Sequence, residues 1–207
     1  LSQSLLLPAF VALFGVAAYP ISRADRFELQ TTLRRYSFSA ERRTDVYSYQ
    51  TGEFLGHPDG LVEASLALRR DLATGIRRHR PDIVVSINFR DSFGPGMLNH
   101  ADHIATGRAV LDAARDAGNR WVFPGEAEPW NRVQAVWAAG SPEAGHGVDT
   151  TDTFDLGIAS LQAHEAYLAG LEGHPDVAEF LAEWARLAGD RLGCTYAASF
   201  EVYPIRL

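Results

Sequence analysis

Cysteine and lysine are among the residues that this sequence has least of. The 207-residue chain contains one cysteine, Cys194, and no lysine. A single cysteine cannot form a disulfide within the chain, so oxidative cross-linking is excluded as a source of stability and a reducing interior is the simpler expectation. Without lysine, every strongly basic side chain is an arginine guanidinium, and no function follows from that composition alone.

Positive charge is also in short supply. The chain has 19 Lys+Arg against 26 Asp+Glu, which gives a formal net charge of -7. This balance argues against a general nucleic-acid binder, so we expect no nucleic-acid partner. With 46% hydrophobic and 22% charged residues, the composition excludes a mainly disordered chain and indicates a globular protein with a real core. We predict a single domain over residues 1–207.

Long hydrophobic runs are absent as well. The apolar stretch that bears on the compartment, residues 5–18, is interrupted by Pro8 and Gly15 and is too short to span a bilayer. No Lys or Arg precedes it, so it matches a secretory signal poorly. We expect a cytoplasmic protein with no membrane partner, and export is the alternative if residues 5–18 form a signal segment.

Hydrophobic periodicity predicts helices that alternate with strands. A helix ending before Pro81 carries an apolar face and arginine-covered faces; the apolar face consists of Leu61, Leu68, Leu72 and Ile76, and the arginines are Arg69, Arg70, Arg77 and Arg78. Residues 83–88 and 133–139 have the composition of buried parallel strands. Helices are predicted from near His103 and from Pro175 to Gly189, and residues 196–202 are predicted to form an edge strand. This order is typical of βα units and predicts an α/β fold with a mostly parallel sheet.

The strongest local signal is Asn99-His100-Ala101-Asp102-His103, which follows the strand at 83–88 and a loop containing glycine and proline. Open α/β sheets bind ligands at such a place. Two imidazoles three residues apart can converge on one point, and the carboxylate between them can fix a tautomer or act as a ligand. The pattern therefore suits a metal or acid/base site. The alternative is a helix start where Asp102 offsets the helix dipole and the histidines cap the helix or face solvent.

In the order and spacing of several segments, the sequence resembles the PIG-L (LmbE-like) deacetylase family of the actinobacterial type. The second motif of that family is written HxDH. Residues 53–207 carry the resemblance and residues 1–50 do not. The matching segments are Glu53-Phe54-Leu55-Gly56, Asp59-Gly60, Arg77 to Pro81, Asp82-Ile83-Val84-Val85, His100 to His103, Ala105 to Ala109, Trp137 to Pro142, His146 to Asp149 and Ala163-His164.

The resemblance implies a Rossmann-like three-layer fold that holds zinc or another divalent metal. It also implies hydrolysis of an N-acetyl (amide) group on a small amino-sugar conjugate of the N-acetylglucosaminyl type. His103 is the implied metal ligand, and His100 is the implied catalytic imidazole that protonates or stabilises the tetrahedral intermediate. Asp102, the second implied catalytic residue, orients that imidazole. Zinc with three protein ligands keeps a position open for the attacking water, which agrees with this chemistry.

Four further residues are candidates for substrate binding: Asp59, Arg90, His146 and His164. Asp59 follows a predicted strand end, and Arg90 suits sugar hydroxyls or a phosphate. His146 is a candidate for the pocket mouth and His164 for the site entrance. Each has an ordinary structural alternative, namely a turn residue, a surface charge, a solvated loop histidine and a satisfied buried histidine.

One departure from the family is large. No His-Pro-Asp-Asp-Glu-like first motif occurs in residues 1–50, and the look-alikes at 57–59 and 174–176 lack the second acid. It stays open whether the N-terminal part of the fold is complete. For this chain we expect weak zinc binding and poor or absent turnover, because one imidazole, even with one carboxylate, cannot make a three-ligand site. The alternative function is a catalytically inactive or truncated PIG-L-like domain that acts as a sugar-binding or interaction module. A lost central strand would expose sheet edges, so we also expect self-association into a homo-oligomer.

Overall fold

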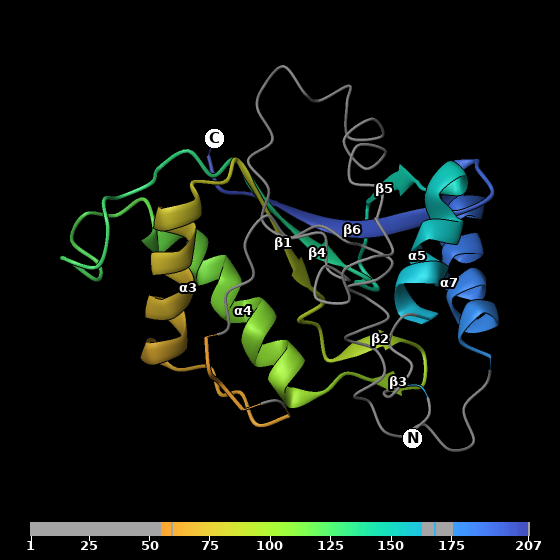
Figure 1. The fold of residues 1–207 in the computed structure, drawn as a ribbon, viewed down its shortest axis with the longest axis horizontal. Helices are drawn as coiled ribbons and strands as arrows, with labels where there is room; N and C mark the ends of the chain where they lie inside the picture. The colour runs from red at the N-terminus through yellow and green to blue at the C-terminus, as the bar shows by residue number, and fades with distance from the viewer. Residues whose placement is uncertain (1–54, 59, 163–167, 169–175, 207) are drawn as a thin grey trace. The chain divides into compact units, whose positions relative to one another are not determined.

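The structure is a computed structural model that describes residues 55–58, 60–162, 168 and 176–206 (Figure 1). Its elements are α3 (Leu66–His79), β1 (Ile83–Ile87), β2 (Ser92–Gly94), β3 (Met97–Leu98), α4 (Ala101–Asp116), β4 (Ala135–Ala139), β5 (His146–Asp149), the 3-10 helix η3 (Thr151–Thr153), α5 (Phe154–Gln162), α7 (Val177–Leu192) and β6 (Ala197–Pro204). The apolar stretch at 5–18 lies outside the described residues.

The chain divides into two compact units. The first, here called the motif unit, takes its described residues from Gly52–His146 and Phe200–Leu207; the second, here called the helical unit, takes them from Gly147–Ser199. Each unit has its own apolar core and is described separately below. A single domain over residues 1–207 stays a prediction.

The strands confirm a mixed α/β fold. In the motif unit β1 pairs parallel with β4, from Ile83 opposite Ala135 to Ile87 opposite Ala139. β4 pairs antiparallel with the second half of β6, so the sheet is mixed. The strand order β1-β4-β6-β5 gives β6 a neighbour on both sides. The prediction of an edge strand at 196–202 was therefore wrong, and the burial of Ala197, Ala198 and Phe200 gives the physical reason.

Helix α3 begins at Leu66, five residues after Leu61, the first apolar residue of its predicted face. Ser65 caps it by accepting a hydrogen bond from Leu68 N at 3.1 Å, and Arg80 ends it in the left-handed conformation just before Pro81. Leu61 lies before the helix and is exposed, which corrects its predicted place on the apolar face. Arg77 is also a correction, because it is buried among main-chain carbonyls and does not cover a surface.

The core of the motif unit lies between its helices and its sheet. Helices α3 and α4 pack on each other, and α4 packs on β1 and β4 (Figure 1). The buried cluster consists of Ala73, Ile76, Val84, Val110, Leu111, Ala113, Ala114, Ala117, Val133 and Val136. Small alanines contribute to this packing from both helices, Ala73 from α3 and Ala113 and Ala114 from α4.

The helical unit is built on α5 and α7. Asp176 caps α7 through Ala178 N at 2.8 Å and Glu179 N at 3.1 Å. The helix does not end at Gly189 as predicted but continues to Leu192, with Gly193 as the left-handed cap. A Cβ at Gly189 would lie 2.6 Å from Cys194 O. Glycine is required there because the chain after the helix folds back against it.

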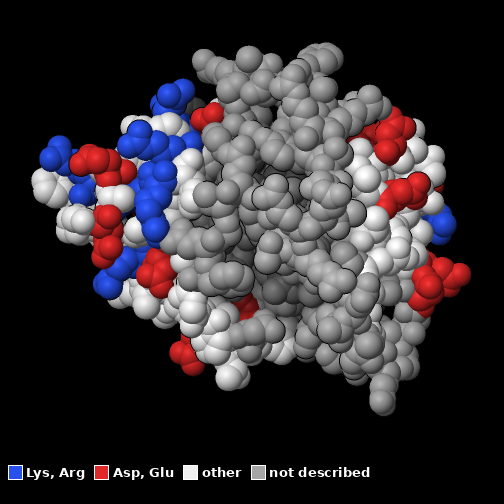
Figure 2. Space-filling view, viewed as in Figure 1, with Lys and Arg blue, Asp and Glu red and all other residues white. Residues whose placement is uncertain are grey.

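Charges of both signs share the surface of the motif unit. On the face drawn in Figure 2, its arginines lie among aspartate and glutamate side chains. Among the described residues visible there, no continuous surface of one sign forms. No helix in the described ranges combines the length and the apolar character that crossing a bilayer needs.

Candidate functional site

The predicted His-x-Asp-His motif lies where β1, the β2–β3 hairpin and α4 follow one another. The loop predicted after β1 contains this short hairpin, and α4 begins at Ala101, two residues earlier than predicted. His100 occupies the N-cap position in an extended conformation, and its side chain does not cap the helix. The histidines therefore do not serve as caps, which removes one part of the structural alternative.

Gly107 brings α4 close to the end of β1. A Cβ at this position would lie 2.8 Å from Ile87 O and 2.9 Å from Phe89 Cβ. No residue with a side chain fits those distances without a shift of the helix. Gly107, the seventh residue of α4, thus allows the close approach of the helix to the carboxyl end of β1.

Asp102, the carboxylate of the motif, accepts hydrogen bonds on both of its oxygens. It is 5% exposed. Its Oδ2 accepts a hydrogen bond from Gly60 N at 2.8 Å, and its Oδ1 accepts from His103 N at 2.9 Å and forms a short contact with His100 Nδ1. Burial by itself would raise the pKa of Asp102, but the hydrogen bonds from His100 and Gly60 outweigh it and hold the pKa below its ordinary value.

The two imidazoles lie next to each other, with ring centroids 5.9 Å apart. The His100 side chain is 41% exposed, whereas His103 is buried. The edge of the Phe93 ring faces His103, with centroids 6.3 Å apart. One histidine is therefore accessible and tied to a carboxylate, and the other is enclosed.

Two buried asparagines, which the sequence analysis did not select, hold the loop between β1 and α4. Asn88 donates to Ser92 O and accepts from Arg90 N, at 2.8 and 2.9 Å. Asn99 donates to the main chain of the same loop and contacts both histidines. The signal available in the sequence was position, because one asparagine ends the strand and the other directly precedes the motif.

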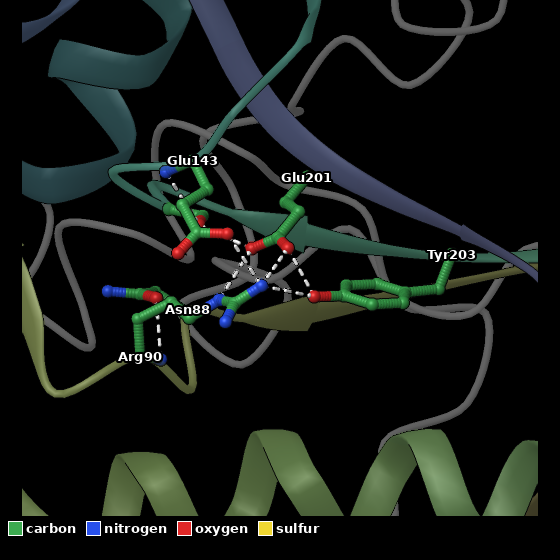
Figure 3. Close-up of polar contacts among 6 residues, drawn as sticks. Asn88, Arg90, Glu143, Glu201 and Tyr203 are labelled. Atoms are coloured by element: carbon green, nitrogen blue, oxygen red, sulfur yellow. Dashed lines mark hydrogen bonds and ion pairs between the residues drawn. The ribbon is translucent and has the colours of Figure 1, made fainter.

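Arg90 lies in a second polar cluster, drawn in Figure 3. Its Nε and Nη2 donate to the two oxygens of Glu201 at 3.2 and 2.5 Å, and Nη2 lies 2.9 Å from Tyr203 Oη. Nη2 also lies 2.8 Å from Glu143 Oε2, and Ser141 Oγ donates to Glu201 at 2.6 Å. The hydrogen bonds with Glu201 raise the pKa of Arg90. Burial opposes the change at Glu201, but its bonds with Arg90, Ser141 and Tyr203 lower the pKa of that carboxyl to about 2.

The structure brings some of the predicted site residues together and leaves others apart. His100, Asp102 and His103 form one cluster, and Arg90 is joined to it through its main-chain oxygen, which accepts from Asn99 Nδ2. His146 is exposed at the start of β5. Asp59 and His164 lie outside the described residues, so their substrate-binding roles stay predictions.

Comparison with known families places these features in context. Residues 23–114 match the family model for PIG-L, described as GlcNAc-PI de-N-acetylase. This segment includes β1, the β2–β3 hairpin and most of α4 with the histidine motif. The match covers 92 of the 207 residues, so the chain is similar to the PIG-L family over less than half of its length. The match begins within the region that the sequence analysis left unassigned. No curated protein matches the chain.

Solved structures with the same fold extend beyond the PIG-L segment. An N,N'-diacetylchitobiose deacetylase from Pyrococcus horikoshii matches with a TM-score of 0.67 and 18% identity, over 90% of this chain and 68% of that one. A conserved protein from Thermus thermophilus gives 0.62 and 23%, over 90% and 76%. A 4-carboxy-2-hydroxymuconate hydratase from Pseudomonas putida gives 0.58 and 19%, over 97% and 91%. A deacetylase and a hydratase share this fold, so the fold alone does not decide the reaction.

The metal that similarity to the PIG-L family implies does not fit the described residues. Among them, no three His, Cys, Asp or Glu side chains come together as a cation site. Both oxygens of Asp102 already accept hydrogen bonds, which leaves His103 as one imidazole ligand. A catalytic zinc site needs three protein ligands, so the described part of the chain does not provide one.

Proposed function

We propose that this chain hydrolyses the N-acetyl (amide) group of a small amino-sugar conjugate, of the N-acetylglucosaminyl type. The observation that carries the proposal is the pair of His100 and Asp102 within the segment that matches the PIG-L family model. The accessible imidazole is bound through Nδ1 to a buried carboxylate whose pKa is lowered. Such a pair is built to hold a proton on a histidine that substrate can reach.

His100 supplies the proton in this proposal. With Nδ1 committed to Asp102, the imidazolium donates from Nε2. A hydrogen bond from that atom stabilises the oxyanion formed when water adds to the amide carbonyl. The attacking water loses its protons to solvent, and the His100 proton passes to the amine nitrogen as the C–N bond breaks, so acetate and the free amino sugar leave. His100 then takes up a proton from solvent. Asp102 stays ionised and keeps the ring oriented, as in other histidine–carboxylate pairs.

Several finer features belong to the proposal. They are the actinobacterial type, the Rossmann-like three-layer arrangement, zinc or another divalent cation as cofactor with His103 as a ligand, a cytoplasmic location and a homo-oligomeric state. The substrate-binding roles of Asp59, Arg90, His146 and His164 are also proposed. The sequence resemblance supports the type, the fold, the cofactor and the substrate-binding roles. The location rests on the single cysteine and the poor match of residues 5–18 to a signal, and the oligomeric state rests on the sheet edges that a lost strand would expose.

A second candidate function is a binding module of the same ancestry that does not catalyse. The specific observation in its favour is that no three His, Cys, Asp or Glu side chains of the described residues come together, whereas catalysis by zinc needs three protein ligands. Such a chain would keep an amino-sugar site around the motif and release no acetate.

Acetate release from a methyl glycoside of N-acetylglucosamine separates the two functions. The full chain is assayed with and without added zinc, beside the variants His100→Gln and His103→Ala. His79→Gln is the matched control, because His79 is an exposed histidine at the end of α3. We expect low turnover in the wild type and the control, and a loss of about 100-fold or more in His100→Gln. Saturable binding of the glycoside with no acetate release under either condition contradicts the hydrolase and supports the binding module.

A further inference from the structure

The side chain of Asn99 contacts both His100 and His103. Its side chain is buried, with 4% of the residue exposed. Its Nδ2 lies 2.9 Å from Arg90 O and 3.0 Å from Asn88 O. Its Oδ1 lies 2.8 Å from His100 N and 3.2 Å from His103 Nδ1. One amide therefore contacts four groups of this loop and helix start.

The orientation of this amide is fixed by main-chain groups on both sides. A carbonyl oxygen only accepts hydrogen bonds, so Arg90 O and Asn88 O require the NH₂ end of the amide. The main-chain N–H of His100 only donates, so it requires the oxygen end. Reversing the amide would break three hydrogen bonds in a buried place. It is therefore the Asn99 oxygen that faces His103 Nδ1.

We infer that Asn99 is a positioning residue that holds neutral His103 in the tautomer with hydrogen on Nδ1. Because Asn99 Oδ1 can only accept, Nδ1 must donate to it. In a neutral imidazole the other nitrogen then carries the lone pair. The opposite tautomer would leave two lone pairs facing each other 3.2 Å apart. The ring of Phe93 lies beside His103, with centroids 6.3 Å apart and the ring planes at 80°.

The arrangement differs from that of His100, whose Nδ1 is bound to a carboxylate. An amide oxygen carries no charge, so it selects a tautomer without the electrostatic stabilisation that Asp102 gives to an imidazolium. The use of His103 Nε2 as a ligand or proton acceptor rests on the proposed function. The tautomer itself does not, because it follows from contacts within the chain.

Nitrogen NMR of the histidine rings tests the inference directly. The full chain, labelled with ¹⁵N and freed of metal by a chelator, is examined at about pH 9, where an ordinary imidazole is neutral. Two-bond ¹H–¹⁵N correlations show which ring nitrogen carries hydrogen, and a His103→Gln variant assigns the signals. We expect the protonated nitrogen of His103 to be Nδ1, whereas neutral histidine in water favours hydrogen on Nε2. A wild-type His103 with hydrogen on Nε2 overturns the inference.

Two substitutions of Asn99 separate the effect of its hydrogen-bond acceptor on the His103 tautomer from the effect of its volume. Asn99→Asp keeps an oxygen toward His103, and we expect the Nδ1–H tautomer to persist. Asn99→Leu has a similar volume and no acceptor, and we expect the tautomer ratio to shift at least tenfold toward Nε2–H. Asn119→Leu is the matched control, since this exposed asparagine of the same unit contacts Trp121 N, and it should leave the His103 signals unchanged.

The result does not depend on turnover. A folded Asn99→Leu chain that keeps His103 fully in the Nδ1–H form overturns the role of Asn99. Asn99→Asp also loses the NH₂ group that donates to Arg90 O and Asn88 O. If neither variant folds, the wild-type spectrum still shows which ring nitrogen of His103 carries hydrogen. A chain with the expected tautomer that releases no acetate contradicts the proposed hydrolase and leaves the inference intact.

Discussion

Two arginines of the motif unit have different kinds of hydrogen-bond partners. Arg77 on α3 is 2% exposed, and its donors reach five main-chain carbonyls: Asp116 O, Ala117 O, Asn119 O, Val122 O and Phe123 O, at 2.7 to 3.2 Å. The Arg90 side chain is 35% exposed, and its partners are the side chains of Glu201, Glu143 and Tyr203 (Figure 3). One guanidinium is bonded to backbone, and the other to groups that titrate.

Because of this difference in partners, the contacts of Arg77 do not depend on pH, whereas those of Arg90 do. The carbonyls around Arg77 belong to the C-terminal end of α4 and the turn that follows, where the helix dipole favours a cation. Main-chain carbonyls take up no proton between about pH 3 and 8, roughly the range in which carboxylates and histidines titrate. Their contribution to the stability around Arg77 therefore stays the same across this range. The partners of Arg90 include two carboxylates, so its network weakens when they are protonated. The first arginine fixes α4 against α3, and the second links the loop after β1 to β6.

Removing Arg77 should have the largest effect on stability. Arg77→Ala leaves five carbonyls without their donor, and we expect the free energy of unfolding to fall by about 3 kcal/mol or more. Urea unfolding at pH 7 measures it. Arg108→Ala is the control, because Arg108 makes one exposed contact with Asp112, for which we expect a loss of about 0.5 kcal/mol or less. Equal losses in the two variants would contradict the structural role of Arg77.

Arg77→Lys sharpens the same comparison. An ammonium keeps the charge but has three donors and no planar fork, so it cannot reach five carbonyls. We expect a loss between those of the wild type and Arg77→Ala. A lysine variant as stable as the wild type would show that charge alone is needed at the end of α4.

Breaking the Arg90 network should cost less. Arg90→Gln leaves Glu201 ionised and 13% exposed, with Ser141 and Tyr203 as its remaining partners, and we expect a loss of about 2 kcal/mol at pH 7. The double variant Arg90→Gln/Glu201→Gln should lose less than the sum of the single variants, because it leaves no uncompensated charge. Additive losses in urea unfolding would show that the two side chains act independently.

The pH dependence of stability should separate the two arginines further. The folded pKa of Glu201 is about 2, below its ordinary value of 4.5, so the unfolded chain takes up this proton first. The stabilisation is complete above about pH 4.5 and is lost as the pH falls toward 2. We expect it to be about 1 to 2 kcal/mol, since solvent screens the half-exposed partner Arg90. Arg90→Gln should lose this acid sensitivity and Arg77→Lys should keep it, as unfolding measured from pH 7 to 3 will show.

The sequence predicted the parts of the site that depend on neighbours in the chain. The strand at 83–87, the helix that follows and the His100–Asp102 pair all rest on local spacing, and the structure has them. Arg77 was misplaced because helical periodicity cannot tell a solvated arginine from one that reaches carbonyls about 40 residues away. Glu201 was missed because it lies 111 residues from Arg90, and only the pairing of β6 with β4 brings the two together.

Among these substitutions, we expect Glu143→Gln to change the free energy of unfolding least. It tests which of the two carboxylates holds Arg90. The Glu143 carboxylate is 58% exposed and contacts one nitrogen of Arg90, whereas Glu201 binds two. We expect Glu143→Gln to lower the free energy of unfolding by less than about 1 kcal/mol and to leave the acid sensitivity in place. Unfolding in urea at pH 7 and pH 3, beside Glu201→Gln, measures both. If Glu143→Gln removed the acid sensitivity, the exposed carboxylate would be the one that holds Arg90, and the pH-dependent contact would lie on the loop after β4 instead of on β6.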